Sequence, residues 1–282
     1  MIMLSASTLG APGTSLQQVL RWLREAGVPG VELRLSSAEI ADPALSRSQR
    51  QDLRAEIDAA GIVVTGIASY VKVAAAAEDN MVVGALVAAL DFAADLGAPA
   101  VRVFSGAPVE PGSYLQRPRL LESAEEVEAR AARRLNAVAG FADESGVLPV
   151  LETHDSHPTG TDIARILARV NGPVGAVWDL MHPWRVGEEL SATWDALAAW
   201  LAAGRGSVQI KDANLRESTT PLLVGDGTLP TAQFGELLVS HGYSGSVTLE
   251  WEKAWHPEAV PLNEALGSAK RWFARYWPDG TV

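Results

Sequence analysis

Eight short apolar runs recur along the 282-residue chain at intervals that suit one strand and one helix each. The runs lie at residues 2–6, 30–35, 62–68, 100–105, 147–152, 174–179, 206–211 and 246–251. Their ends are separated by 27 residues (152 to 179) to 47 residues (105 to 152), with the first taken at residue 5 and the last at 250. Each interval fits a parallel strand followed by a crossover helix. Eight uninterrupted units predict an α/β fold with a single (β/α)₈ TIM-barrel domain over residues 1–282, and not an open sheet.

The segments between the runs have the period of amphipathic helices. Residues 16–23 carry apolar side chains at helical spacing, and residues 262–276 carry a second such stripe. Ser46 with Gln49, and Ser123 with Glu126, have the spacing of capping boxes at helix starts. These signals support the alternation of strands and helices and indicate no linker.

The composition argues against several classes of protein. The formal net charge is −11, which disfavours a nucleic-acid partner because phosphate binding needs a basic surface. No cysteine is present, so disulfides, thiolate ligands and thiol nucleophiles are excluded. The N-terminus lacks a basic segment, and no run of about 18 apolar residues occurs, so neither a signal peptide nor a membrane span is expected. We expect a cytoplasmic protein, and homo-oligomerisation stays open.

The last four runs share polar side chains near their C-terminal ends, namely Glu152, Asp179, Gln209 and Glu250. Parallel barrel strands end at one face, so these side chains are expected to point inward near the mouth. Three converging carboxylates repel one another, and buried unpaired charge is costly. One divalent metal ion removes this problem, with Mn²⁺ or Mg²⁺ preferred by oxygen ligands and Co²⁺ or Zn²⁺ as alternatives.

Ion pairing offers a different explanation of the same carboxylates. Lys211, Arg102 and Arg34 lie close to strand ends and are the available cations. For any one carboxylate this explanation competes with metal binding. Four polar ends on four successive strands favour the metal.

Four residues are candidates for contact with a substrate: His154, His182, Lys211 and Arg34. His154 shares a strand face with Glu152 by the period of two, and His182 lies in the loop after the sixth run. Imidazole titrates near neutral pH, so either histidine suits proton transfer or orientation of hydroxyl groups. Lys211 and Arg34 suit a substrate oxygen. The alternatives are a histidine that caps a backbone carbonyl and salt bridges from the two cations.

Two loops invite a functional interpretation. Residues 106–118 form a long excursion on the catalytic side, which is either a lid or plain surface. Residues 224–228 include Gly225-Asp-Gly227 before a predicted helix, where a glycine loop can bind phosphate. Asp226 would repel phosphate, so we interpret this segment as an ordinary turn.

The motifs at the strand ends resemble one family. They are Leu151-Glu-Thr-His154, Asp179-Leu-Met-His182, Gln209-Ile-Lys-Asp212, Gly225-Asp-Gly227 and Leu249-Glu-Trp-Glu-Lys-Ala-Trp-His256-Pro257. Over nearly the whole chain they resemble the sugar phosphate isomerase/epimerase family, which has a xylose isomerase-like TIM barrel and is related to the endonuclease IV superfamily.

This resemblance implies a ligand set and a pair of catalytic residues. One divalent metal ion would be held by Glu152, Asp179, the residue at position 209 and Glu250. The two glutamates would flank the substrate as an acid–base pair, with His182 on a substrate oxygen. Many ketose epimerases of this group carry histidine where this chain has Gln209, and a neutral amide is a weaker donor than imidazole.

The leading hypothesis is a metal-dependent isomerase or epimerase that acts on a sugar or related polyol ketone through an enediolate. A dehydratase or lyase that acts on a keto-sugar or inosose by the same proton abstraction is the second hypothesis. A DNA-repair endonuclease of the superfamily is disfavoured, because those enzymes use a histidine-rich three-zinc site and this acidic chain has five histidines. A non-catalytic sugar-binding barrel is the remaining alternative.

Overall fold

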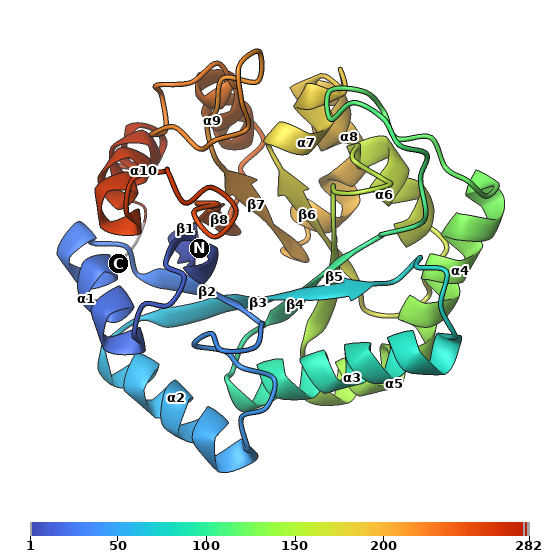
Figure 1. Cartoon of the computed structure of the whole chain (residues 1–282), viewed down its shortest axis with the longest axis horizontal. Coiled ribbons are helices and arrows are strands. Elements are labelled where there is room, and N and C mark those ends of the chain that lie inside the picture. The colour runs from blue at the N-terminus through green and yellow to red at the C-terminus, as the bar shows by residue number, and fades with distance from the viewer. Residues whose placement is uncertain (1, 279, 281–282) are drawn as a thin grey trace.

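The computed structural model describes residues 2–278 and 280, and in it eight parallel strands close into a barrel in sequence order (Figure 1). The strands are β1 (Met3–Ser7), β2 (Gly30–Arg34), β3 (Val63–Lys72), β4 (Ala100–Phe104), β5 (Leu148–Glu152), β6 (Gly175–Asp179), β7 (Gly206–Ile210) and β8 (Ser246–Leu249). β1 pairs with β8 and completes the ring. The predicted TIM barrel is confirmed. The predicted domain limits, 1–282, include positions 1, 279, 281 and 282, which lie outside the described residues.

A ring of helices surrounds the barrel (Figure 1). The helices are α1 (Leu16–Ala26), α2 (Arg47–Ala59), α3 (Asp79–Asp95), α4 (Ala124–Ala137), α5 (Ala139–Ser145), α6 (Gly160–Leu167), α7 (Met181–Arg185), α8 (Leu190–Leu201), α9 (Thr231–Ser240) and α10 (Leu262–Tyr276), with a short 3₁₀ turn, η1 (Thr8–Gly10), after β1. No helix of the described residues has the length and apolarity needed to cross a membrane.

The helices bury the faces that their sequence period predicts. In α1 the buried side chains are Leu16, Val19, Leu20 and Leu23. Strands of a parallel barrel are covered on both sides, which explains why they read as continuous apolar runs. All five residues of β6 are buried, for example.

The two predicted capping boxes differ in the structure. Ser46 and Gln49 form a complete box, in which each side chain accepts a hydrogen bond from the other residue's backbone N–H. Ser123 accepts from the backbone N–H of Glu126 but donates its hydroxyl to the Glu126 carboxylate at 2.7 Å. The Glu126 carboxylate therefore accepts from the Ser123 hydroxyl, whereas in a complete box it would accept from the Ser123 backbone N–H.

β3 is longer than the sequence suggested. Its predicted end was residue 68, whereas the strand continues to Lys72. The pairing with β4 shifts register between Ala68 and Lys72, and Lys72 then pairs with Phe104. Such an irregularity lets a strand bend and continue beyond the rim. The extension carries Lys72 to the mouth of the barrel.

The segment around Gly225-Asp-Gly227 is a turn, as predicted. The carboxylate of Asp212, just after β7, accepts hydrogen bonds from the backbone N–H groups of Gly225, Gly227 and Leu229. A side chain at position 227 would collide with this carboxylate, since a Cβ would lie 2.1 Å from Asp212 Oδ1. The backbone donors that a phosphate would need are already used.

Candidate active site

The polar ends of β5 to β8 meet inside the mouth of the barrel. Glu152, Asp179 and Gln209 are fully buried, and Glu250 is 4% exposed. Ligand atoms of Glu152, Asp179 and Glu250 all lie within 4.8 Å of one another. Gln209 pairs in register with Asp179, and its Nε2 donates to Glu250 Oε1 at 3.2 Å. The structure therefore brings together all four residues that the sequence proposed as metal ligands.

Two buried cations contact these carboxylates. Arg102, from the middle of β4, donates through Nη1 to Glu152 Oε2 at 3.0 Å and to Glu250 Oε1 at 3.3 Å. The Nζ of Lys211 lies 2.8 Å from Asp179 Oδ2 and also contacts the carboxylate of Glu250. The ion pairs proposed as an alternative are thus present for these two cations.

Glu252 makes a further contact with the Nζ of Lys211, so four carboxylates surround the two cations. Burial disfavours the charged form of Lys211, but its carboxylate neighbours outweigh this and raise its pKa well above the usual value. At Glu152 the balance is opposite: burial, Glu250 and Asp179 together raise the pKa well above that of a free carboxyl, although Arg102 opposes them.

This centre fits a divalent metal ion. Four carboxylates against two cations leave a net charge of −2 when all are ionised, in a region that is nearly free of solvent. Two buried oxygens, Glu152 Oε1 and Gln209 Oε1, have no hydrogen-bond partner among the described residues. Unpaired buried oxygens are costly, and a cation bound between them removes that cost. Oxygen donors of this kind suit Mn²⁺ or Mg²⁺.

His182 faces the same centre. Its Nδ1 accepts a hydrogen bond from Arg185 Nε at 3.2 Å, which places the proton of the neutral ring on Nε2. Nε2 has no hydrogen-bond partner in the described part of the chain, and it lies 3.9 Å from Glu152 Oε1 and 3.8 Å from Asp179 Oδ2. Burial, together with nearby His154 and the surrounding cations, lowers the pKa of His182 well below its usual value. The ring is a neutral donor aimed at the centre of the mouth.

His154 lies beside His182, with ring centroids 4.4 Å apart. It stacks on Phe104 at 4.2 Å, and its Nδ1 lies 2.8 Å from Asp155 Oδ1. Asp155 has a positive φ of 51°, a strained conformation for a residue other than glycine. Glu152, His154 and His182 also form a second group whose ligand atoms lie within 4.8 Å of one another.

Arg34 lies apart from the carboxylate centre. Its Nη1 pairs with Glu39 at 2.8 Å, and its Nε donates to the hydroxyl of Tyr70 at 2.8 Å. Its guanidinium also stacks 4.8 Å from the ring of Trp255, which is 55% exposed. Arg34 thus supports two aromatic residues at the rim. It does not line either of the two cavities that open at the mouth.

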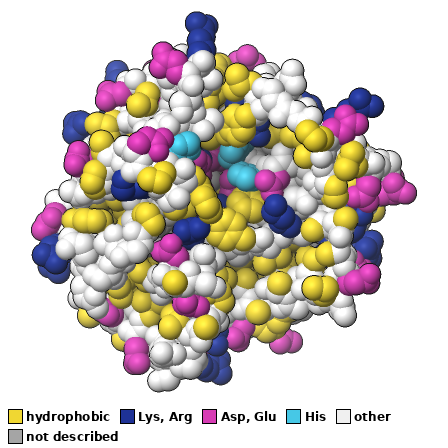
Figure 2. All heavy atoms as spheres, in the orientation of Figure 1, with side chains coloured by type: hydrophobic (Ala, Val, Ile, Leu, Met, Phe, Trp, Pro, Cys, Tyr) yellow, Lys and Arg dark blue, Asp and Glu magenta, His cyan; other side chains and the backbone are white. Residues whose placement is uncertain are grey.

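Two adjoining cavities open at the mouth. The inner cavity has a volume of about 330 Å³ and is lined by Arg102, Glu250, Glu252, Tyr70 and Trp255, among others. The outer cleft, of about 780 Å³, lies under the 106–119 segment. Lys72, Tyr114, His154, Asp155 and His182 line both. Figure 2 shows histidine and acidic side chains gathered around a hollow near the centre of this face.

Residues 20–276 match the family described as xylose isomerase-like TIM barrel. The chain belongs to this family. A Streptomyces coelicolor protein named "Putative hydroxypyruvate isomerase" is 29% identical over 239 residues, which are 78% of this chain and 80% of the relative.

Solved structures have the same fold. A D-psicose 3-epimerase from Clostridium cellulolyticum H10, solved with D-tagatose, is 16% identical with a TM-score of 0.75, and covers 97% of this chain and 98% of its own. The IolI protein with a bound zinc atom is 18% identical with a TM-score of 0.76, and covers 97% and 99%. The resemblance inferred from the motifs is confirmed at the level of the family.

The sequence pattern of this xylose isomerase-like barrel did not predict several residues that line the two cavities. Lys72 was missed because β3 was expected to end at residue 68, although Tyr70-Val-Lys72 continues the strand pattern. Tyr114 and Arg185 come from a loop and a short helix, where no period identifies an inward side chain. Arg185 does follow His182 by three residues, which places the two on one face of α7.

Proposed function

We propose that the protein is a divalent-metal-dependent isomerase or epimerase of a small ketose or related hydroxy-ketone. The observation that carries this proposal is the convergence of Glu152, Asp179, Gln209 and Glu250 on one buried centre that retains a net negative charge. The family membership and the relative named for an isomerase support it.

The metal, for which Mn²⁺ is our first choice, would be held by oxygens of Glu152, Asp179, Gln209 and Glu250. When bound it supplies Lewis acidity that polarises a carbonyl and its neighbouring hydroxyl. Gln209 Nε2 donates to Glu250, so its Oε1 is directed elsewhere and is free to act as a ligand.

Glu152 and Glu250 are the proposed acid–base pair. Glu152 ends β5 and Glu250 follows β8 directly, with β6 and β7 between these strands, so we infer that they approach a substrate in the mouth from different sides. One carboxylate removes the proton from the carbon next to the carbonyl, which gives an enediolate. Return of a proton by the other glutamate at the same carbon gives the epimer, and return at the neighbouring carbon gives the aldose–ketose isomer.

The cations and His182 have distinct proposed roles. Arg102 donates to both glutamates and therefore fixes their separation. Lys211 holds Asp179 and Glu250. The unpartnered Nε2–H of His182 is a donor for a substrate oxygen on which negative charge develops, and a neutral imidazole serves this role without losing its proton.

The inner cavity suits a small substrate. Its volume of about 330 Å³ is at the low end for small-molecule sites. Ketotetroses to ketohexoses and hydroxypyruvate, the latter taken from the name of the relative, are the first compounds to test.

Elimination is the second candidate reaction, and the observation that favours it is the pair formed by His154 and Asp155. Nδ1 of His154 lies 2.8 Å from the Asp155 carboxylate, which orients the ring. The ring so held is placed to transfer a proton to a departing β-hydroxyl. The same enediolate would then yield a dehydrated product from a keto-sugar or inosose.

The test is a proton NMR screen of ketoses, hydroxypyruvate and inososes in D₂O with Mn²⁺. We expect deuterium at the carbon next to the carbonyl of the true substrate, together with a new epimer or isomer. Loss of water without epimer would assign elimination. Absence of both exchange and product for every compound would contradict the proposal.

A further inference from the structure

The outer cleft differs in charge from the rest of the chain. Its lining includes four cationic side chains, Lys72, Arg117, Arg119 and Arg185, and two acidic ones, Glu110 and Asp155. These side chains alone sum to +2, and Asp162, which pairs with Arg117 from outside the lining, reduces the excess to +1, in a chain whose formal net charge is −11. A concave site focuses the electrostatic field of its charges, so this local excess of positive charge acts on any molecule that enters the cleft.

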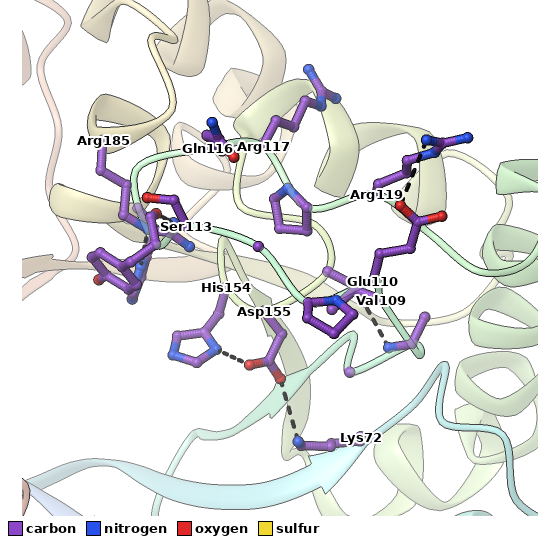
Figure 3. Close-up of a pocket in the computed structure, with 18 residues that line it drawn as sticks. Lys72, Val109, Glu110, Ser113, Gln116, Arg117, Arg119, His154, Asp155 and Arg185 are labelled. Atoms are coloured by element: carbon purple, nitrogen blue, oxygen red, sulfur yellow. Dashed lines mark hydrogen bonds and ion pairs between the residues drawn. The ribbon is translucent and has the colours of Figure 1, made fainter.

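Two of the four cations are already neutralised by partners. Arg117 pairs with the buried Asp162 at the start of α6, and Arg119 pairs with Glu110 at 3.6 Å. Both arginines are more than half exposed at the outer edge. Figure 3 shows them directed away from the His154–Asp155 pair. They leave Lys72 and Arg185 as the cations of interest.

Arg185 has no carboxylate partner within 4.0 Å among the described residues. Its nitrogens instead donate to neutral groups, His182 Nδ1 and the backbone carbonyl of Tyr114, and its guanidinium stacks 4.0 Å from the Tyr114 ring. A partly buried guanidinium held by neutral groups keeps its full charge available. The aromatic ring and the hydrogen bonds fix the position of Arg185, so the side chain loses little conformational entropy when a ligand binds.

Lys72 is held by packing and by a long ion pair with Asp155. Its stem crosses Gly106, where a Cβ would lie 2.5 Å from the lysine Cγ and Cδ. Its Nζ lies 3.9 Å from Asp155 Oδ2, too far for a hydrogen bond. Asp155 also lies 2.8 Å from His154, so it is shared between the two. Lys72 and Arg185 approach the cleft on different sides of the His154–Asp155 pair (Figure 3).

We propose that the outer cleft is a subsite for an anionic group, a phosphate or a carboxylate, at the end of the substrate remote from the metal centre. Lys72 and Arg185 supply its charge. Both cavities share His154 and His182, so one extended molecule reaches from the carboxylate centre into the cleft. The proposal rests on the proposed function for the inner end of the substrate, and it names the class: ketoses or polyol ketones with an acidic terminus.

The experiment measures binding, so that it does not depend on turnover. The probes are ribitol, ribitol 5-phosphate and ribonate, a neutral polyol with its phosphate and carboxylate counterparts, titrated calorimetrically into the Mn²⁺-loaded protein. We expect at least one charged probe to bind about tenfold or more tightly than ribitol, as a charge-assisted contact provides. The phosphate and carboxylate arms identify which anion the cleft prefers.

Three variants locate the effect. Lys72→Met and Arg185→Met keep apolar stems, and each should bring the affinity for the charged probe close to that for ribitol. Arg47→Met, on the outer helix α2, removes the same charge at a side chain that is 71% exposed and should leave the preference intact. Equal affinity for charged and neutral probes in the wild type would overturn the subsite, as would a preference that survives in both cleft variants.

The same data separate this inference from the proposed function. Discrimination between charged and neutral probes, without solvent exchange on any ketose, would support the subsite and contradict the isomerase. Exchange on a neutral ketose without any discrimination would support the isomerase and contradict the subsite.

Discussion

The two halves of the barrel place their charged residues differently. In β5 to β8 the carboxylates stand at or just beyond the strand ends: Glu152 and Asp179 close their strands, and Glu250 follows β8 directly. In β2 and β4 two buried charged residues stand in the middle, at Glu32 and Arg102, while the cations Arg34 and Lys72 end β2 and β3. The second half therefore presents carboxylates at the mouth, whereas the buried charges of the first half lie within the barrel wall.

This difference separates two kinds of chemistry. Charges at the strand ends reach the cavity and can exchange partners with a metal or a substrate. Charges inside the wall are held by their neighbours and act on the carboxylates at the mouth, as Arg102 does through its hydrogen bonds to Glu152 and Glu250. Three predictions test this division, beginning with the largest expected effect.

The first prediction concerns the two glutamates of the second half. Glu152→Gln and Glu250→Gln retain size and a ligating oxygen but remove the base, so each should lower kcat by about 10²–10⁴-fold on the substrate found by the exchange screen. The measurement is steady-state kinetics with saturating Mn²⁺. Glu125→Gln, on the outer helix α4, is the control and should match the wild type. Near-normal activity of both active-site variants would contradict the acid–base assignment.

The second prediction concerns metal content. After dialysis against Mn²⁺ the wild type should hold close to one ion per chain by elemental analysis, and Asp179→Ala should hold almost none. Gln209→His should bind the ion at least as tightly, because imidazole is the stronger donor. Asp91→Ala, at the partly exposed face of α3, serves as the control. The same content in wild type and Asp179→Ala, whether high or low, would argue against a site on β5 to β8.

The same division explains what the sequence could reveal. Period and spacing predicted all eight strands, because apolar runs in a parallel barrel are buried on both faces. The candidate ligands could be recognised because Glu152 and Asp179 each end an apolar run. The metal itself and the role of each residue stay predictions, which the experiments above address.

The remaining residues could not be read in this way. Lys72 depends on a register shift between β3 and β4, which no local pattern encodes. Arg185 depends on how a short helix packs against the 106–119 loop. Glu32 did leave a signal, a carboxylate between Val31 and Leu33 in an apolar run, and that signal indicates burial. The charged groups that shift its pKa, Arg102, Glu250 and Lys211, are far from it in the sequence, so its environment emerges only in three dimensions.

The third prediction tests the first half of the barrel through Glu32. Burial, with a smaller contribution from Glu250, raises its pKa from 4.5 to about 7, although Arg102 and Lys211 oppose the shift. Between these two values the folded protein binds a proton that the unfolded chain has lost. Stability from this group is therefore fully present below pH 4.5 and is lost as the pH rises through 7.

The size of the effect follows from the shift. Each pKa unit corresponds to about 1.4 kcal/mol, so between pH 5 and pH 8 the wild type should lose about 2–3 kcal/mol relative to Glu32→Gln, which mimics the protonated form. Urea unfolding of the metal-free protein in EDTA at both pH values measures this difference, and the pH dependence of groups that do not interact with Glu32 cancels between the two proteins. Glu56→Gln, at a partly exposed position of α2, should follow the wild type at both pH values. If the stability of wild type and of Glu32→Gln depended on pH in the same way, Glu32 would be ionised throughout this range. The buried charges in the wall of the first half would then be paired as fully as the carboxylates at the strand ends of the second half.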